Sequence, residues 1–404
     1  MRILFVATAF SPLAARWINQ LMETGWEIYI YDIANQSIHP LFHDVKVYGL
    51  MPLLQKPTLK NVHYTSAISF RCEYQYKYLA ALAKRILPNS AQYLVEIIQK
   101  LEPDIIHSLK MQQESYTVFE ARKLLNNQLP CPWIYSVWGS DIYYWRKFQT
   151  HVVKIQQVLH SCDYLWADNP RDLQLATENG FRGDFLGVVP TGGGYPINEM
   201  QSVENLLPSK RKIIAVKGYQ SVDGGQALTS IEALIKCGKA LSGFKIVVHS
   251  AIDTYASKHF DEVYAKAKEL EINCDVEVEF LPFSPPEVIW DLFSKSRIAL
   301  AISNTDGTPN AMLEAMVMGA FPIQSDTGGL EGWIESGKNG YLVPYDNISI
   351  ISQALLHALS DNSIVDNAYK TNLQLTREKL DAKAIQVQVI QQYQAIYRNK
   401  VGKV

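Results

Sequence analysis

Short apolar runs alternate with longer stretches of helical periodicity along the whole chain. Apolar runs of about four to eight residues between helical segments are typical of βαβ units, whose parallel strands are buried on both faces. The first half of the chain offers such runs at residues 2–7, 27–32, 105–108, 133–138, 164–167 and 185–189. The second half offers them at residues 212–217, 245–250, 276–281, 298–302, 321–324 and 340–343. The pattern predicts an α/β protein with parallel sheets.

The series of strands is interrupted near the middle of the chain. Residues 190–196 read Pro-Thr-Gly-Gly-Gly-Tyr-Pro, and polar sequence follows before the next strand begins. Glycine and proline interrupt regular structure, and domain boundaries fall in such segments. A chain of 404 residues also suits two domains better than one α/β core. We therefore expect a hinge at about 190–210, between domains at residues 1–195 and 206–380, and a final helix within residues 381–404.

Composition and charge exclude several classes of protein. The net charge of −2 gives no general attraction for nucleic acid, so we expect no nucleic-acid partner. The five cysteines are scattered without a CxxC pair, which is typical of reduced thiols rather than a disulfide framework or a zinc site. No apolar run approaches the ~18–20 residues of a spanning helix. The apolar start of the chain fits a first strand better than a signal sequence. We expect a cytoplasmic protein.

Residues 70–100 leave two interpretations open. The stretch carries arginine and lysine among tyrosines and many aliphatic residues. A basic aromatic helix can lie on an anionic membrane surface, which would give peripheral contact at the inner face of the membrane. The same residues can equally pack as an ordinary domain helix.

The most informative segment is residues 303–319, which follows an apolar strand and opens a helix. Thr308 is a favourable N-cap, and Pro309 then occupies the first helical position. The first turn of such a helix directs free backbone N–H groups into the crevice beyond the carboxyl end of the strand. Parallel sheets bind phosphate groups in that crevice. The segment therefore predicts an anion site in the second half of the chain.

Charged residues around this helix suggest what the anion belongs to. Glu314 stands among apolar side chains, and a buried carboxylate costs several kcal/mol unless donors surround it, as the hydroxyls of a ribose would. Asp306, in the preceding loop, could reach a sugar hydroxyl. Lys217 ends a predicted strand, where its ammonium could neutralise a diphosphate. The alternatives are that Asp306 caps the helix, that Glu314 meets an internal arginine or lysine, and that Lys217 is an ordinary surface lysine.

The first half contributes weaker candidates. His107 ends a predicted strand and could hydrogen-bond a sugar hydroxyl, or it could be a buried, satisfied histidine. Trp138 and Asp141 follow the next strand, where Asp141 could face an interdomain cleft and Trp138 could stack on a sugar. The first loop carries Arg16 but no glycine pair, which argues against a dinucleotide-binding fingerprint.

These motifs resemble those of the family 4 glycosyltransferases, which have the GT-B fold. The family signature is two acidic residues with seven residues between them, the second opening Glu-Ala-Met-x-x-Gly. Asp306 and Glu314 hold these positions, and residues 314–319 complete the pattern. Residues 104–107, 138–141, 325–329 and 340–344 also resemble family segments. The likeness covers nearly the whole chain and is strongest in residues 298–345.

The resemblance implies a fold and a set of roles. The fold would be two Rossmann-like domains facing each other across a cleft, with the acceptor on the first domain, the nucleoside-diphosphate sugar on the second, and the final helix returning to the first domain. The enzyme would be retaining and would need neither a metal nor another cofactor. Glu314 would hold the ribose, Asp306 the donor sugar, Lys217 the phosphates, and His107 would lie beside the reacting sugar. Further donor contacts would come from Gly218, Gly307, Thr308, Pro309 and Asn310, and Arg16, Trp138 and Asp141 would be acceptor-side candidates.

The chain also departs from the family pattern. Asp306 replaces the commoner glutamate and is one methylene shorter, which bears on the choice of sugar. Val216 precedes Lys217 where the family usually has Gly-Arg, and Trp138 stands where many members have histidine. The resemblance therefore leaves the acceptor undetermined.

We predict a glycosyltransferase that acts on a glycan or lipid-linked acceptor, in bacterial polysaccharide or lipid-linked glycan synthesis. Two alternatives share the fold. A nucleotide-sugar 2-epimerase would convert a donor with no acceptor present. A non-catalytic sugar-nucleotide or glycan-binding protein would bind without turnover.

Overall fold

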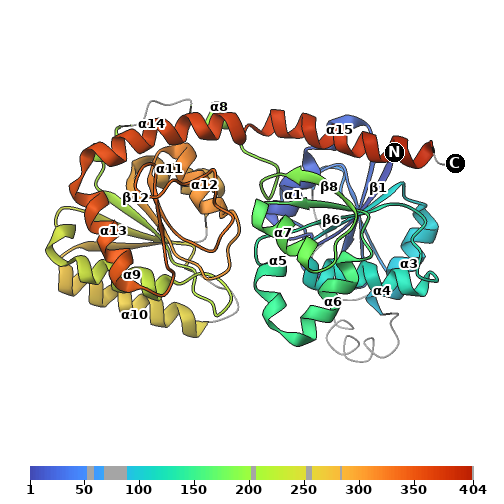
Figure 1. Ribbon diagram of the computed structural model, residues 1–404, viewed down its shortest axis with the longest axis horizontal. Coiled ribbons are helices and arrows are strands. Elements are labelled where there is room, and N and C mark those ends of the chain that lie inside the picture. The colour runs from blue at the N-terminus through green and yellow to red at the C-terminus, as the bar shows by residue number, and fades with distance from the viewer. Residues whose placement is uncertain (52–58, 68–88, 202–205, 252–256, 283, 403–404) are drawn as a thin grey trace. The chain divides into compact units, whose positions relative to one another are not determined.

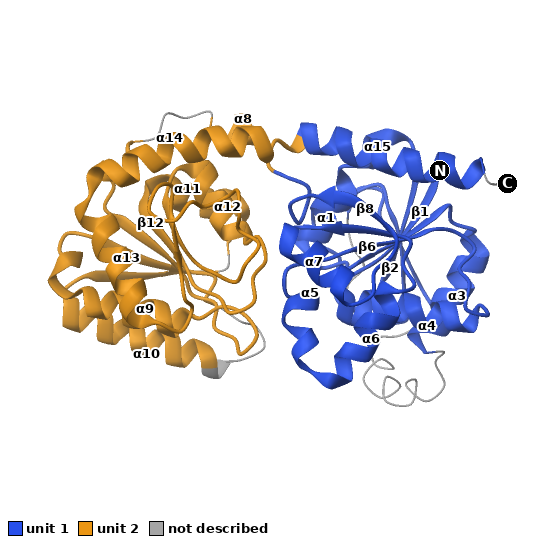
Figure 2. Ribbon diagram, viewed as in Figure 1, with its two compact units in different colours: residues 1–194, 383–404 blue, residues 195–382 orange. Residues whose placement is uncertain are grey.

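The computed structural model describes residues 1–51, 59–67, 89–201, 206–251, 257–282 and 284–402. The chain forms two compact units (Figure 2). Unit 1 comprises residues 1–194 and 383–404, so it is assembled from both ends of the chain, and unit 2 comprises residues 195–382. The chain therefore crosses between the units twice, after Gly194 and after Ala382.

Unit 1 is built on an eight-stranded sheet in the order β4-β3-β2-β1-β5-β6-β7-β8, and all of its strand pairs are parallel. The strands are β1 (Arg2–Ala7), β2 (Glu27–Asp32), β3 (Lys46–Gly49), β4 (His63–Ser66), β5 (Ile105–Leu109), β6 (Trp133–Ser136), β7 (Tyr164–Ala167) and β8 (Asp184–Val188). The central strands are buried along almost their whole length, as the continuous apolar runs predict.

Helices cover both faces of this sheet (Figure 1). On one face lie α3 (Ser90–Leu101), α4 (Tyr116–Leu124), α6 (Gln149–Leu159) and α7 (Pro170–Glu178). On the other lie α1 (Pro12–Asn19) and the C-terminal helix α15 (Ala382–Val401). Helix α15 buries Ile385, Val389, Tyr393 and Ile396 against the unit 1 core. The short helix α5 (Ser140–Tyr143) follows β6.

Unit 2 has a six-stranded parallel sheet in the order β11-β10-β9-β12-β13-β14. Its strands are β9 (Ile213–Lys217), β10 (Lys245–His249), β11 (Glu277–Leu281), β12 (Ser296–Ala301), β13 (Phe321–Ser325) and β14 (Tyr341–Val343). One face is covered by α9 (Ala227–Cys237), α10 (Ser257–Cys274) and α13 (Ile348–Ser360). The other is covered by α8 (Ile197–Met200), α11 (Pro286–Lys295) and α12 (Asn310–Met318), and α14 (Asn362–Lys379) precedes α15.

The second unit begins earlier than the sequence suggested. We expected the C-terminal domain to start at residue 206, but Tyr195, Ile197 and Met200 are buried in the unit 2 core. The preceding residues 192–194 all have a left-handed backbone, with φ of +87°, +80° and +82°. Only glycine adopts this conformation at little cost, which explains three glycines in a row directly before the unit boundary.

The cysteines and the basic aromatic segment at residues 70–100 lie only partly within the described residues. Cys131, Cys162, Cys237 and Cys274 are buried free thiols, and Cys72 lies outside the described residues. Most of the 70–100 segment, up to residue 88, also lies outside them, whereas residues 90–101 form α3 and pack in the core as an ordinary helix. Within the described ranges, no helix is both long and apolar enough to cross a membrane.

Candidate active site

The candidate site lies at the topological switch point of the unit 2 sheet. Strands β9 and β12 are neighbours at its centre, but β9 leads on to β10 on one side and β12 to β13 on the other. Ligands of open α/β sheets bind outside the carboxyl ends of strands at such a point. The loops after these strands are hydrogen-bonded to each other. The Gln226 N–H donates to Ile302 O at 2.8 Å, and the Asn304 N–H donates to Gly224 O at 3.1 Å.

Two opposite charges meet at this edge. Lys217 is the last residue of β9, and Asp306 lies in the loop after β12. The Lys217 Nζ is 3.1 Å from the Asp306 Oδ2, and the two side chains are 20% and 27% exposed. The Thr327 hydroxyl, from the loop after β13, donates to the Asp306 backbone carbonyl and holds this loop in place. The end of one strand and two loops therefore position the ion pair, and both of its side chains are partly exposed.

Helix α12 begins one residue later than we expected. Its N-cap is Pro309, in an extended backbone conformation, and no side chain caps the helix, so Thr308 is not the N-cap. Proline has no N–H to contribute, and the first helical residue is Asn310. The N–H groups of the first turn have no partner within a helix and carry its positive dipole end. They remain candidates for binding an anion beside Lys217.

Glu314 lies one turn into α12 and is half-buried. Its Oε1 is 3.2 Å from the hydroxyl of Tyr195, which also donates to the Asn310 Oδ1 at 2.8 Å. We expected ribose hydroxyls around this carboxylate, or else an internal arginine or lysine, and the structure places the hydroxyl of Tyr195 beside it. The ribose role of Glu314 stays a prediction. Tyr195 was not predicted from the sequence, because nothing local distinguishes it from the glycine-rich segment it ends.

Gly218 and Gly307 were expected to let a ligand approach the backbone. A Cβ on Gly218 would lie 2.5 Å from the Val248 Cγ1, so packing against β10 already requires glycine there. Gly307 is buried in the loop before α12. The neighbouring His249 is also buried, and burial together with the charge of Lys217 lowers its pKa to about 4. His249 is therefore neutral at pH 7, and Lys217 supplies the charge at this point.

The expectation that His107 lies beside a reacting sugar is wrong. Its side chain is fully buried in β5, with its Nδ1 2.6 Å from the Tyr393 hydroxyl and its Nε2 2.8 Å from the Ser136 hydroxyl. Burial lowers the pKa of His107 well below its ordinary value, so the ring is neutral. Both ring nitrogens are used inside unit 1, which leaves neither for a substrate.

The acceptor-side candidates differ in their placement. Asp141 does not face an opening as expected, because its carboxylate is fully buried and accepts hydrogen bonds from the Trp138 N–H and the Tyr135 hydroxyl. Burial raises the pKa of Asp141 to about 7. Trp138 is partly exposed in the short segment between β6 and α5. Arg16 donates to the carbonyl of Gly194, the last residue before the unit boundary. An acceptor role for Arg16 and Trp138 stays a prediction.

Each unit matches a family model over most of its length. Residues 2–165 match the model described as glycosyl transferase 4-like, and residues 234–375 match the model of the glycosyl transferases group 1. The chain belongs to the group 1 glycosyltransferases. This confirms the family that the motif around Asp306 and Glu314 predicted.

Solved structures share the GT-B fold of this glycosyltransferase over nearly its full length. HepE from Anabaena in complex with UDP-glucose is 15% identical, with a TM-score of 0.69 over 98% of this chain and 100% of that chain. Sucrose-phosphate synthase from Thermosynechococcus elongatus is 14% identical, with a TM-score of 0.71 over 99% and 100%. A UDP-forming trehalose-phosphate synthase from Burkholderia xenovorans is 14% identical, with a TM-score of 0.67 over 99% of both chains. No curated protein sequence matches the chain.

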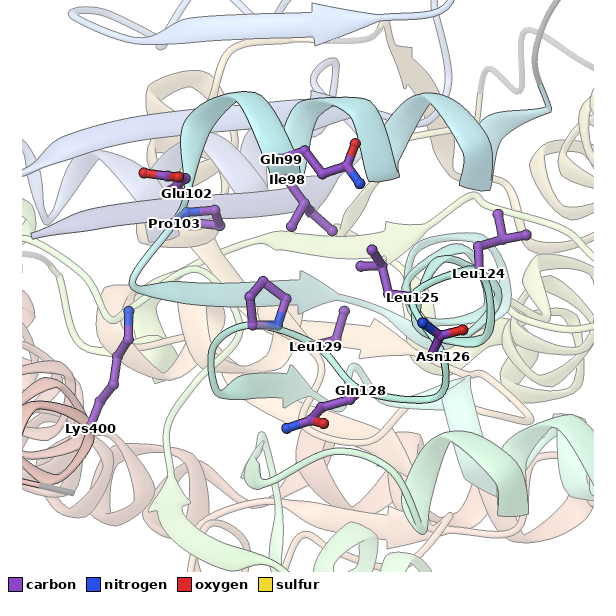
Figure 3. A pocket seen from close by; sticks show the side chains of 11 residues that line it. Ile98, Gln99, Glu102, Pro103, Leu124, Leu125, Asn126, Gln128, Leu129 and Lys400 are labelled. Carbon is purple, nitrogen blue, oxygen red and sulfur yellow. The ribbon is translucent and has the colours of Figure 1, made fainter. Parts of the chain in front are cut away.

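One cavity of the glycosyltransferase is lined by none of the candidate residues Lys217, Asp306 and Glu314. A pocket of about 780 Å³ in unit 1 is lined by residues that include Pro103, Pro130 and Lys400. Figure 3 shows this pocket from close by, with Pro103 and Lys400 among its labelled residues. Pro103 and Pro130 precede β5 and β6, so the pocket lies at the amino ends of the strands, opposite the edge where ligands of such sheets bind. In the part of the chain that the structure describes, no cluster of three or more His, Cys, Asp or Glu side chains could hold a metal ion.

Proposed function

We propose that this glycosyltransferase moves a sugar from a nucleoside-diphosphate sugar to a hydroxyl of a glycan or lipid-linked acceptor, with retention at the anomeric carbon. The observation that carries the proposal is the meeting of Lys217 and Asp306 at the switch point of unit 2, where the loop of Asp306 leads into α12, the helix that carries Glu314. A cation, two acidic groups and the start of a buried helix suit a ligand that carries both phosphates and hydroxyls. The setting we propose is bacterial polysaccharide or lipid-linked glycan synthesis.

Each group has a proposed role. The Glu314 carboxylate accepts hydrogen bonds from the ribose hydroxyls, and Asp306 accepts one from the donor sugar. Lys217 and the first-turn N–H groups of α12 meet the diphosphate, whose negative charge grows as the sugar leaves. Uridine nucleotides are the first to test, because the similar HepE structure contains UDP-glucose.

The proposed reaction needs no further group from this chain. The bond between the anomeric carbon and the phosphate oxygen breaks, and the acceptor oxygen bonds to the same face of that carbon. The acceptor proton passes to an oxygen of the departing phosphate. His107 takes no part because it is buried, and the proposal includes no carboxylate nucleophile, metal or cofactor.

A thermal-shift screen tests the donor half of the proposal. UDP, GDP, ADP and their glucose or mannose conjugates would each be added to the full-length protein. A ligand at 100 times its Kd adds about 2.7 kcal/mol to the free energy of unfolding, so the correct nucleotide raises the melting temperature by several degrees. Inorganic phosphate at the same concentration is the control. If no nucleoside diphosphate gives a shift beyond that of phosphate, the proposed donor site is wrong.

Product analysis tests the reaction itself. The donor found in the screen would be incubated with and without a panel of glycan acceptors, and the products followed by proton NMR. We expect a new glycosidic bond with the anomeric configuration of the donor, and only slow hydrolysis without acceptor. An inverted product would contradict the proposed stereochemistry. A 2-epimer formed from donor alone would identify an epimerase, and binding without any product would identify a binding protein.

A further inference from the structure

Tyr195 connects both chain crossings of unit 2. It is the first residue of the unit, and its side chain is fully buried. Its N–H donates to Leu380 O at 2.8 Å, and its carbonyl accepts from the Ala382 N–H at 2.9 Å. Ala382 is the last residue of unit 2 before the chain returns to unit 1. One residue therefore ties the incoming segment to the outgoing one.

The side chain of the same residue reaches the candidate donor site. The Tyr195 hydroxyl lies 2.8 Å from the Asn310 Oδ1 and 3.2 Å from the Glu314 Oε1, on the first turns of α12. A hydroxyl has one proton to donate, so these two acceptors share it. The ring packs in the same core cluster as Leu313, Met316 and Leu380, which fixes its direction. Its hydroxyl can therefore hold the Glu314 carboxylate in one orientation.

We propose that Tyr195 is a positioning residue that orients Glu314 for the ribose. Through its backbone hydrogen bonds it also couples donor binding to the order of the two segments where the chain passes between the units. The proposal rests on the donor role of Glu314 proposed above. Ribose hydroxyls that donate to Glu314 fix that carboxylate, and the fixed carboxylate holds the Tyr195 hydroxyl. The two hydrogen bonds of the Tyr195 backbone then open less often, because opening them would also displace the hydroxyl from an ordered partner. The coupling works equally in the other direction, so the ordered crossing favours donor binding.

Replacing the hydroxyl alone tests the positioning. Tyr195→Phe keeps the buried ring but removes its hydrogen bond to Glu314, and titration calorimetry with UDP measures the result. We expect the Kd to rise roughly tenfold, while the melting temperature falls by no more than about 4 °C. Because Glu314 would hold the ribose before and during the reaction, KM for the donor rises while kcat changes little. Tyr341→Phe is the control. It also removes one tyrosine hydroxyl from unit 2, but Tyr341 lies in β14 and its hydroxyl is hydrogen-bonded to His357 instead of Glu314.

Hydrogen exchange tests the link to the crossings. The amides of Tyr195 and Ala382 report on the two backbone bonds directly. UDP at saturation should slow their exchange severalfold in the wild-type protein and in Tyr341→Phe, but not in Tyr195→Phe. If UDP protects these amides equally in Tyr195→Phe, the link to the crossings is wrong. A role limited to packing would predict the same UDP-dependent protection with and without the hydroxyl.

Glu314→Gln separates this inference from the proposal on which it rests. If Glu314→Gln weakens UDP binding while Tyr195→Phe binds within twofold of wild type, the positioning role is wrong and the donor site stands. If Glu314→Gln binds UDP as tightly as wild type, or if no nucleoside diphosphate binds at all, the donor site itself is wrong. Weakening in both variants, with UDP-dependent protection lost in Tyr195→Phe, is the result that the inference predicts.

Discussion

The charge of Lys217 is balanced within unit 2 by Asp306, at 3.1 Å. Both side chains are partly exposed, so solvent screens their attraction and the pair contributes at most about 1 kcal/mol to stability. A diphosphate brings more negative charge than Asp306 and would compete with it for Lys217. Asp306 would then be released toward the donor sugar, so one carboxylate would oppose the binding of a bare nucleotide yet assist a sugar nucleotide.

The variant Asp306→Asn separates these two effects. It removes the competing charge from Lys217 and the repulsion of the diphosphate, so the affinity for UDP should rise about two- to fivefold. Sugar transfer should fall about tenfold or more, because an amide is a weaker acceptor for the sugar hydroxyl. Calorimetry and a turnover assay measure the two quantities. The control is Asp291→Asn, which breaks the exposed pair with Lys295 on α11. Weaker UDP binding in Asp306→Asn would contradict the proposed competition.

Asp141 gives unit 1 a specific dependence on pH. Burial and the nearby charge of Glu114 raise its pKa to about 7, although Lys110 and the Trp138 N–H oppose the shift. In the unfolded chain an aspartate titrates near pH 3.9. Between about pH 4 and 7 the folded state therefore holds a proton that the unfolded state has lost, and stability falls as the pH rises through this window.

Asp141→Asn should remove this dependence. An asparagine carbonyl can still accept from Trp138 and Tyr135 but carries no charge. Relative to wild type, the variant should gain stability steadily from pH 4 to 7, by about 4 kcal/mol at most. Thermal unfolding across that range measures the difference, and Asp184→Asn on the exposed part of β8 is the control. A difference between Asp141→Asn and wild type that does not change with pH would show that Asp141 is ionised throughout.

The elements of the fold were predicted best where their own residues decide the structure. The central strands of both sheets read as apolar runs, because parallel strands are buried on both faces. Strands β3 and β4 were missed, since they are short and β4, at the sheet edge, reads His-Tyr-Thr-Ser. Pairing with a neighbouring strand decides the conformation of such an edge, and no local pattern reports that pairing.

The packing partners of helix α15 were also not predictable from local sequence. The sequence predicted a final helix here, but the cluster that this helix completes comes from distant parts of the chain. The Tyr393 hydroxyl bonds to His107 and accepts from the Trp17 Nε1 at 3.3 Å. His107 could not be recognised as a core residue from its neighbours in sequence, because its partner Tyr393 is 286 residues away.

Truncation of that tyrosine tests whether α15 is part of unit 1. Tyr393→Ala should destabilise the unit by about 3–5 kcal/mol, because it opens a cavity and leaves the polar groups of His107 and Trp17 without their partner. Tyr397→Ala, a partly exposed position on the same helix, should cost much less. Denaturant unfolding followed by tryptophan fluorescence compares the two. Equal effects would contradict the buried role of Tyr393.

On the scale of the whole molecule, the site divides into a part that the sequence predicts and a part that it does not. Lys217 ends β9, Asp306 lies in the loop after β12, and Glu314 lies one turn into the helix that follows. Residues in such positions meet at one edge of a parallel sheet. Tyr195 reaches Asn310 and Glu314 across sequence separations of 115 and 119 residues. No pattern within the glycine-rich segment indicates that contact. Among the acceptor-side candidates, Asp141 proved to be buried, because the local sequence does not report the packing around it.

The proposed donor site depends most on Glu314 holding a nucleotide, and calorimetric titration with UDP, GDP and ADP tests this directly. Wild-type protein and Glu314→Gln would be compared, with melting temperatures recorded to show that both are folded. We predict that one nucleoside diphosphate binds the wild type and that Glu314→Gln weakens it by about 10- to 100-fold, because hydrogen bonds to a charged group are the stronger ones. Equal affinities for the two folded proteins, or no binding of any of the three to the wild type, would contradict the donor site described for unit 2.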